Sequence, residues 1–386
     1  MAGRKRIGLT YSYDEQWIAG TYYIMNIVHG LNCLADDIKP VVVVLTENRK
    51  NYILLKEQTQ YPYLEFFELP IKAPLYSPLE RTINKLAWIL AKAKWIRKKP
   101  RRAKVDLIYP FELEKVSEKP ISRVNWVPDF QEVYLPELFP KEELERRRRH
   151  QENTICKGDW VVFSSEDSRK DFRLLFPRAT VKQYVLPFAV THPQYNDLSI
   201  NILLTKYELP EAYFFAPNQF WAHKNHLVII EALNHLKKKG IECCVAFSGR
   251  ELDHRNQAYV EKLKAKIADY NLEDAIRFLG FIPRKDQLKL MSESIAIVQP
   301  SKFEGWSTVV EDAKALGHFI ICSSIKVHRE QIEQNCSFFE PDDFLTLAEI
   351  MKKGLESGFK TQPIDYNKQR LNFALRFLDF VDQASK

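Results

Sequence analysis

The feature that most constrains the fold is the alternation of short apolar runs with helix-forming stretches along the chain. Residues 40–45 (PVVVVL) form a nearly continuous β-branched run, which is typical of a strand buried on both faces. Similar runs recur, separated by segments with helical apolar spacing, and this alternation predicts two doubly wound parallel sheets. The expected strands are Arg6–Tyr11, Pro40–Leu45, Val105–Tyr109, Val124–Val127, Trp160–Phe163 and Val181–Leu186 in the first block, and Tyr213–Pro217, Cys243–Ser248, Ile276–Leu279, Ile295–Val298 and Phe319–Cys322 in the second.

The two blocks are expected to meet near Thr191–Leu209, where strand periodicity is lost and polar turn residues gather. We therefore predict a first domain over residues 1–192, a second over 193–365, and a terminal amphipathic helix over 366–386. That helix either packs back on the first domain or simply caps the second.

Composition supports two cores and locates the positive charge. Apolar residues make up 45% of the chain and aromatic residues 12%, which excludes a disordered or fibrous protein. The net charge is +7. Residues 1–190 carry 32 Lys and Arg against 24 Asp and Glu, whereas residues 191–386 carry 25 against 26, so the basic character belongs to the amino-terminal half.

The cysteine spacing and the amino terminus indicate a cytoplasmic protein. The six cysteines show no Cys-x2-Cys spacing and no neighbouring histidine cluster, so the sequence suggests no zinc or redox site. The basic amino terminus lacks the apolar core of a signal peptide. No apolar run in the sequence approaches the roughly 20 residues that span a bilayer.

The segment Ser301–Gly317 (SKFEGWSTVVEDAKALG) carries the clearest chemistry. An apolar run ended by Pro300 precedes it, and helix formers follow, so its turn should lie between a strand and a helix N-terminus. In parallel α/β sheets this position favours anions such as a diphosphate, and carboxylates there can accept sugar hydroxyls. The sequence predicts a nucleotide-sugar site formed by Glu304, Gly305, Trp306, Ser307 and Thr308.

This segment resembles the Glu-x7-Glu signature of retaining glycosyltransferases of the GT-B fold, family 4. Glu304 matches the first Glu of that signature. The second falls on Asp312, with Glu311 beside it as a competitor, so the residue that would hold the ribose stays open. Trp306 and Ser307 stand where the family usually has Phe and Gly, which would narrow the pocket beside the donor sugar.

Two further stretches match the same family at its phosphate-binding positions. In FFAPNQFWAHKNHL, Lys224 lies on the turn before a helix, where the resemblance implies contact with the pyrophosphate. Gln219 stands where the family has Arg, so Lys224 is expected to carry more of the phosphate charge. The family has a Gly-Gly pair before the first helix. This chain has Ala19-Gly20, and Gly20 alone would let the backbone approach the phosphates.

The resemblance also implies roles for two carboxylates. Asp129 in NWVPDFQEVYLPELF would orient the acceptor or donor, and its alternative is to cap the following turn. Glu330 in VHREQ would lie near the nucleotide, and its alternative is a surface salt bridge. The expected catalytic residues are therefore Asp129, Lys224 and Glu304.

The resemblance implies an α/β GT-B architecture: two Rossmann-like doubly wound parallel-sheet domains facing a deep cleft, with a C-terminal helix that crosses back to the first domain. The implied activity is transfer of a hexose or deoxyhexose, with retention, from a GDP-, dTDP- or UDP-linked sugar. The implied acceptor is a glycan or lipid-linked glycan of a cell-surface polysaccharide such as O-antigen, capsule or exopolysaccharide. The nucleotide sugar would be a co-substrate, and no metal or other cofactor is expected.

Other classes of function remain open from the sequence. One alternative is a nucleotide-sugar epimerase-like enzyme on the same fold, and another is a non-catalytic sugar-nucleotide or membrane-binding protein. The residues Ile83–Lys104 combine helical apolar spacing with seven cations from Lys94 onward, which predicts contact with an anionic membrane surface at the inner face of the plasma membrane. No RNA-binding signature is present, so nucleic acid is not an expected partner.

Overall fold

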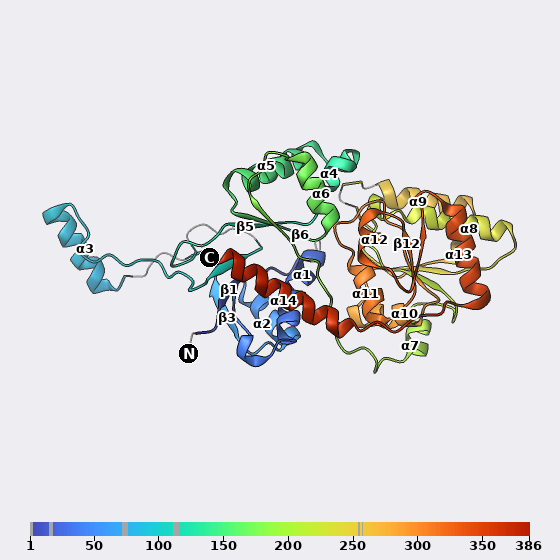
Figure 1. Ribbon diagram of the computed structural model, residues 1–386, viewed down its shortest axis with the longest axis horizontal. Coiled ribbons are helices and arrows are strands. Elements are labelled where there is room, and N and C mark those ends of the chain that lie inside the picture. The colour runs from blue at the N-terminus through green and yellow to red at the C-terminus, as the bar shows by residue number, and fades with distance from the viewer. Residues whose placement is uncertain (1–2, 15–17, 72–75, 111–115, 254, 257) are drawn as a thin grey trace. The chain divides into compact units, whose positions relative to one another are not determined.

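The computed structural model describes residues 3–14, 18–71, 76–110, 116–253, 255–256 and 258–386 (Figure 1). Its contacts divide the chain into two compact units. The first comprises residues 1–126 with 377–386, and the second comprises residues 127–376. The boundary predicted from the sequence, between residues 192 and 193, lies later in the chain than the division between residues 126 and 127 in the structure. The structure groups residues 127–190 with the second unit because they contact the loop that follows residue 303 and the helix that includes residue 330.

The first unit is built on a parallel sheet with strand order β3-β2-β1-β4. β2 is buried over most of its length, as the β-branched run predicted, because both faces of the sheet are covered. The C-terminal part of α14 also belongs here, since Phe377 and Phe380 pack edge-on against Tyr109 at 5.6 and 5.9 Å between ring centroids. The elements are β1 (Arg6–Thr10), α1 (Ile18–Asn32), β2 (Val41–Thr46), α2 (Arg49–Thr59), β3 (Leu64–Glu68), α3 (Pro78–Ala91), β4 (Leu107–Tyr109) and α14 (Tyr366–Ala384).

A small sheet has the order β5-β6-β7, in which β6 and β7 are parallel; β5 contains the boundary between residues 126 and 127, and β6 and β7 belong to the second unit. The core of this sheet is a cluster of aromatic rings that includes Phe130, Phe163 and Phe172. Its elements are β5 (Val124–Val127), α4 (Gln131–Tyr134), α5 (Lys141–Lys157), β6 (Trp160–Phe163), α6 (Glu166–Leu175) and β7 (Lys182–Val185).

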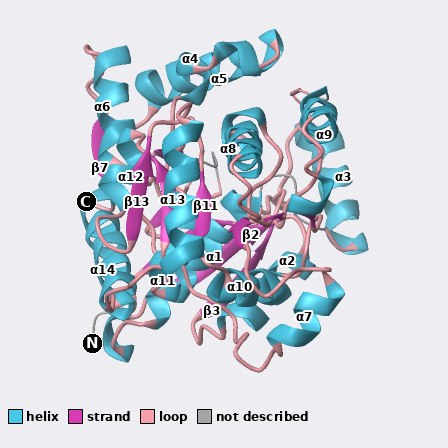
Figure 2. Cartoon of the chain, turned by 90° about the vertical axis from the view of Figure 1, so that its right-hand side faces the viewer, coloured by secondary structure: helices cyan, strands magenta, loops and turns pink. Residues whose placement is uncertain are grey.

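A six-stranded parallel sheet of order β10-β9-β8-β11-β12-β13 forms the rest of the second unit. Phe214 belongs to a core with α8, α9 and α13, while its neighbour Phe215 belongs to a core with α7, α10 and α11, so the sheet is covered on both faces (Figure 2). The predicted α/β fold with doubly wound parallel sheets is therefore confirmed. The strands are β8 (Phe214–Ala216), β9 (Val245–Phe247), β10 (Ile276–Phe278), β11 (Ile297–Gln299), β12 (Ile320–Ser323) and β13 (Cys336–Phe339); the helices are α7 (Ile200–Lys206), η3 (Ala222–Lys224), α8 (His226–Lys238), α9 (Ala258–Asp269), α10 (Arg284–Glu293), α11 (Thr308–Leu316), α12 (Lys326–Gln331) and α13 (Phe344–Ser357).

Two strands were missed by the sequence analysis, and both lie at sheet edges. β3 (LEFFE) and β13 (CSFF) are only partly buried, so they carry polar residues and lack a continuous apolar run.

In the part of the chain that the structure describes, no helix combines the length and apolarity needed to cross a bilayer.

Candidate functional site

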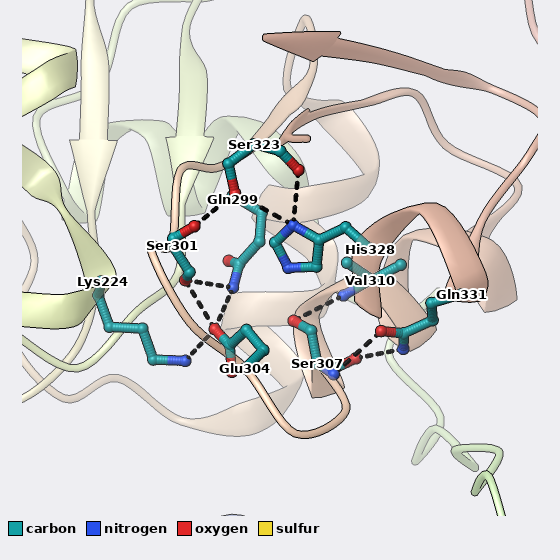
Figure 3. Close-up of polar contacts among 9 residues, drawn as sticks. All are labelled: Lys224, Gln299, Ser301, Glu304, Ser307, Val310, Ser323, His328 and Gln331. Atoms are coloured by element: carbon teal, nitrogen blue, oxygen red, sulfur yellow. Dashed lines mark hydrogen bonds and ion pairs between the residues drawn. The ribbon is translucent and has the colours of Figure 1, made fainter. Parts of the chain in front are cut away.

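An ion pair joins the ends of two neighbouring parallel strands of the second unit. β8 and β11 are adjacent, so the loops that follow them meet at one edge of the sheet. Lys224 follows β8 and Glu304 follows β11, and Lys224 Nζ lies 2.6 Å from Glu304 Oε1 (Figure 3). Their side chains are 15% and 10% exposed. The structure thus brings together the two residues that the sequence placed at a shared site.

Asn225 fixes the two loops against each other. It adopts the left-handed conformation at φ 57° between η3 and α8, where Asn is tolerated better than most residues. Its side-chain Nδ2 donates to the carbonyls of Pro300 at 3.2 Å and Pro341 at 2.7 Å. The Lys302 amide also donates to the His223 carbonyl at 2.8 Å. These bonds position Lys224 beside the Glu304 loop before any ligand binds.

Glu304 is held in its ionised form by a set of donors. Its Oε1 accepts hydrogen bonds from Gln299 Nε2 at 2.9 Å and Ser301 Oγ at 2.6 Å, in addition to Lys224 (Figure 3). Burial alone would raise the pKa of this carboxyl, but the Lys224 charge and hydrogen bond, together with His328 and Ser301, outweigh burial and lower it. The site therefore presents a fixed negative oxygen beside a buried cation.

His328, which the sequence analysis did not single out, lies fully buried beneath this network. Its Nδ1 lies 3.0 Å from the Ser323 carbonyl and 3.2 Å from Ser323 Oγ (Figure 3). Burial lowers the pKa of His328 to about 4, so the ring is neutral at neutral pH. The sequence signal that could have located His328 is its spacing in VHREQ. It lies three residues before Gln331, so the two side chains fall on the same side of α12.

The neutral His328 makes stability depend on pH. An unfolded histidine takes up a proton near pH 6.5, whereas folded His328 does so only near pH 4, so unfolding becomes easier as the pH falls between these values. We expect wild type to lose about 2 kcal/mol more unfolding free energy than His328→Asn between about pH 7 and pH 5. Urea unfolding of both proteins at the two pH values measures this difference. Equal losses would show that the pKa of His328 is not lowered in the folded protein.

The N-terminus of α11 is clamped by Gln331. Gln331 Oε1 accepts from the Ser307 amide at 3.0 Å, and its Nε2 donates to the Ser307 carbonyl at 2.7 Å. Ser307 Oγ in turn accepts from the Val310 amide at 3.4 Å as the helix N-cap (Figure 3). Thr308 is the first residue of α11, so the positive end of the helix dipole follows the Glu304 loop directly.

Gly305 brings Asp129 to the same loop. A Cβ at Gly305 would lie 2.4 Å from the Pro128 carbonyl oxygen and 3.0 Å from Asp129 Cβ, so only glycine permits this approach. Asp129 Oδ1 accepts from the Gln131 amide at 3.1 Å, which is the local turn contact weighed from the sequence. Burial raises the pKa of Asp129, and the nearby charges of Glu132 and Glu304 raise it further.

Replacing Gly305 by alanine should destabilise the second unit, because the Pro128 backbone must move to admit the new methyl group. We expect a loss of about 1–3 kcal/mol of unfolding free energy, the usual range for overpacking. Gly317→Ala is the matched control. Nothing lies within 4 Å of a Cβ added at Gly317, so this variant creates no steric clash. Its φ of +63° is unfavourable for alanine, so any loss of unfolding free energy reports the backbone conformation alone. A loss at Gly305 no larger than that at Gly317 would contradict the close approach.

The two candidates for the ribose contact have different partners. Asp312 Oδ1 accepts from Arg284 and lies 2.9 Å from His192 Nε2. Burial opposes its ionisation, but Arg284 and His192 lower the pKa of Asp312 overall. Glu311 accepts from Lys314 at 2.8 Å, from Gln331 at 3.0 Å and from the Tyr366 hydroxyl. Both carboxylates are buried and hydrogen-bonded, so the assignment between Glu311 and Asp312 stays open.

Three other predicted donor residues make structural contacts. Trp306 Nε1 donates to the Phe188 carbonyl at 3.0 Å. Gln219 Oε1 accepts from the Arg250 amide at 2.9 Å. Glu330 accepts from the amides of Glu166 and Asp167 at 2.7 and 3.0 Å, and so caps α6. Burial raises the pKa of Glu330 despite these bonds. The donor-binding roles of these three residues stay predictions.

Gly20 belongs to the first unit, and its loop Ser12–Thr21 includes residues 15–17, which lie outside the described residues. Gly20 is in the first turn of α1, where the sequence predicted a loop, and it lines a cavity of about 440 Å³ at the carboxyl ends of β1 and β2. The other lining residues are Thr10, Tyr11, Ser12, Asp14, Thr21, Ile24, Leu45, Thr46, Glu47, Asn51, Leu69, Pro110 and Trp126. The contact of Gly20 with phosphate stays a prediction.

No group of three or more His, Cys, Asp or Glu side chains that could hold a metal ion occurs among the described residues. The pair described above is an amine and a carboxylate. The expectation of a metal-independent reaction stays a prediction.

Comparison with known proteins matches residues 206–370 to the family model of Glycosyl transferases group 1. An O-antigen chain mannosyltransferase of Salmonella typhimurium, RfbU, is 28% identical over 151 residues. That alignment spans 39% of this chain and 40% of the relative.

Solved structures share the fold over nearly the whole chain. HepE of Anabaena, solved with UDP, has 19% identity and a TM-score of 0.64, covering 98% of this chain and 100% of its own. WaaG, a glycosyltransferase involved in lipopolysaccharide biosynthesis, has 15% identity and a TM-score of 0.53, covering 98% of this chain and 95% of its own.

Proposed function

We propose that this chain of GT-B fold is a glycosyltransferase that transfers a hexose or deoxyhexose with retention from a nucleotide-diphosphate sugar, a proposal supported by the match of residues 206–370 to the Glycosyl transferases group 1 model. The observation that carries this proposal is the buried Lys224–Glu304 pair at the adjoining ends of β8 and β11, directly before the N-terminus of α11. The arrangement offers a cation, a helix dipole and a fixed carboxylate within one loop pair.

Each part of this arrangement has a use in sugar transfer. As the bond from the sugar C1 to the phosphate oxygen breaks, negative charge grows on the leaving diphosphate, where Lys224 and the N-terminus of α11 stabilise it. Glu304 accepts hydrogen bonds from donor-sugar hydroxyls and so holds C1 in position. In the proposed same-face attack, the acceptor oxygen bonds to C1 while its proton passes to the leaving phosphate.

The remaining carboxylates serve positioning roles in this proposal. Asp129 lies beside Gly305 and orients the acceptor or the donor sugar. Either Asp312 or Glu311 holds the ribose. The amine and the helix dipole supply the charge stabilisation that a metal provides in other transferases, so we propose a metal-independent reaction.

The relatives support two kinds of donor. The name of the Salmonella relative supports a mannosyl donor, whereas HepE was solved with UDP and with UDP-glucose. We propose a GDP-, dTDP- or UDP-linked hexose donor, and a glycan or lipid-linked glycan acceptor in O-antigen, capsule or exopolysaccharide assembly.

The cavity of the first unit supports an acceptor site there. The Tyr11 hydroxyl, which has no hydrogen-bond partner among the described residues, belongs to a residue only 3% exposed that lines this cavity. Glu47, Asn51 and Trp126 line it too, and such a mixture of polar groups and an aromatic face suits a sugar ring. We propose that Tyr11 donates to an acceptor hydroxyl.

Tyr11→Phe should therefore raise the acceptor KM about tenfold while leaving the donor KM unchanged, since a hydrogen bond in a buried site is worth about 1.5 kcal/mol. Initial rates at varied acceptor and fixed donor measure this split. Tyr13→Phe, at a residue that is 40% exposed, is the control. An unchanged acceptor KM would remove Tyr11 from the acceptor site.

The two alternatives predict different products. An epimerase-like enzyme would use the same residues to release and isomerise the donor sugar without an acceptor, and a binding protein would leave the donor intact. Incubation with each nucleotide sugar, with and without an extract of cell-envelope glycolipids, separates the three by the fate of the sugar.

The first test is a thermal-shift screen against UDP, GDP, dTDP and their sugars with EDTA present. A ligand that binds only the folded state raises the unfolding midpoint according to its concentration relative to its Kd. We expect one nucleotide series to stand out. Stabilisation that appears only when a divalent cation is added would overturn metal independence, and no stabilisation by any nucleotide would overturn the donor site.

A further inference from the structure

Helix α3 presents an apolar stripe that its own unit does not cover. Leu79, Leu86 and Leu90 are 71%, 54% and 75% exposed, and their spacing of seven and four residues places them on one side of the helix. Ala87 is the only buried residue of this helix. Ile89, beside the stripe, is 61% exposed.

The helix has its own terminal contacts, so the stripe is a formed surface. Ser77 and Glu80 make a reciprocal capping box: the Ser77 amide donates to Glu80 Oε2 at 2.7 Å, and the Glu80 amide donates to Ser77 Oγ at 3.3 Å. In the middle of the helix the side chain of Asn84 exchanges two hydrogen bonds of 2.8 Å with the backbone of Ile96. The segment after α3 is thereby folded back along the helix.

That segment adds positive charge to the apolar stripe. No Asp or Glu occurs from Arg81 through Lys104, while seven Lys and Arg lie between Lys94 and Lys104. Glu80, the one carboxylate of the helix, is paired with Lys98 at 2.6 Å. Trp95, within the cationic stretch, is 63% exposed. The surface thus combines apolar side chains, an indole and an excess of cations.

These properties select among the partners that could cover the stripe. A second copy of the chain would bring the same cations together, which charge repulsion opposes. A nucleic acid would satisfy the cations but leave the three leucines in water. An anionic bilayer surface accepts both, because leucine side chains enter the acyl boundary while Lys and Arg remain among the phosphate head groups.

We propose that α3 with the following residues to Lys104, here called the α3 surface, binds the chain to anionic lipid. With 14 residues the helix is too short to span a bilayer and lies along its surface. This inference goes beyond the proposed sugar transfer and does not depend on the donor chemistry. If both hold, the α3 surface keeps the acceptor-binding unit at the leaflet that carries lipid-linked glycans.

Co-sedimentation of the full chain with vesicles tests this. We expect binding to vesicles of phosphatidylcholine mixed with phosphatidylglycerol, weak binding to phosphatidylcholine alone, and loss of binding in high salt. The double variant Leu86→Glu, Leu90→Glu should lower the partition coefficient at least about tenfold. Leu174→Glu, which alters an equally exposed leucine of α6, is the matched control and should bind like wild type.

Two outcomes would overturn the proposal. One is equal vesicle binding by the double variant and wild type. The other is a wild-type dimer in analytical ultracentrifugation that the double variant abolishes, with no vesicle binding by either, which would assign the stripe to a second copy of the chain. Nucleotide stabilisation of the double variant, measured alongside, reports the donor site separately, so failure of sugar transfer and failure of membrane binding are distinguishable.

Discussion

Replacing Glu304 by glutamine is expected to lower kcat by about 100-fold or more while leaving nucleotide-diphosphate binding intact. The change keeps the shape of the side chain and an oxygen that can accept from Ser301 and Gln299, but it removes the charge that Lys224 pairs with. Removing one preorganised hydrogen-bonding group from an active site typically lowers kcat by about 10²–10³.

Nucleotide binding should survive in this variant because the proposed phosphate ligand is Lys224, not Glu304. Releasing Lys224 from its 2.6 Å ion pair leaves the amine available, so the Kd for the nucleotide diphosphate should be unchanged or lower. The measurements are steady-state transfer and calorimetric titration of the nucleotide diphosphate. Glu349→Gln, which breaks a surface pair with Lys239, is the control and should keep full activity. Normal transfer by Glu304→Gln would sink the proposed site.

Lys224→Ala is expected to weaken nucleotide-diphosphate binding by about 30–100-fold and nucleoside binding hardly at all. Hydrogen bonds from a charged donor contribute roughly 1.5–3 kcal/mol, and only the diphosphate would lose one. Parallel titrations with the nucleoside and its diphosphate measure the difference. Lys302→Ala changes another cation of the same loop region, one that pairs with Asp342, and controls for a general loss of positive charge. Equal losses for nucleoside and diphosphate would count against the phosphate contact.

The same substitution should also destabilise the fold, because it leaves the buried Glu304 carboxylate without its cation. Removing one partner of a buried pair typically costs about 3–5 kcal/mol, and the two remaining neutral donors to Glu304 should reduce that cost. Combining Lys224→Ala with Glu304→Gln removes the uncompensated charge, so the double variant should be more stable than Lys224→Ala alone. Additive losses would mean that the two residues do not interact in solution.

The interior strands were predictable, and so were the edge strands β4, β5, β7 and β10, whereas the edge strands β3 and β13 were missed. Residues 40–45 were predicted as a strand because a sheet covered by helices on both sides favours a nearly continuous apolar run. β3 and β13 have one free edge and partial burial, so selection for apolar residues is relaxed there and no continuous run remains.

The site was predictable as far as its residues lie on strand-to-helix turns. The turns that carry Lys224 and Glu304 were located because each follows a recognisable strand, and the family resemblance then singled out these two residues. Two residues that support the neighbouring backbone were missed. His328 and Gln331 lie on α12, far along the chain, and nothing in VHREQ distinguishes their inward-facing side chains from Glu330, which was chosen instead and caps α6.

By itself, the sequence determined the alternating α/β architecture, the strand-to-helix turns that carry Lys224 and Glu304, and the apolar and cationic character of the α3 surface. These follow from local periodicity and composition, which each segment carries independently. Only the tertiary structure decided that Lys224 and Glu304 pair, that Gly305 packs against Pro128, and that Trp306 donates to Phe188. Such contacts join residues as much as 177 positions apart, as for Gly305 and Pro128, so they depend on how the loops meet once the sheets have formed.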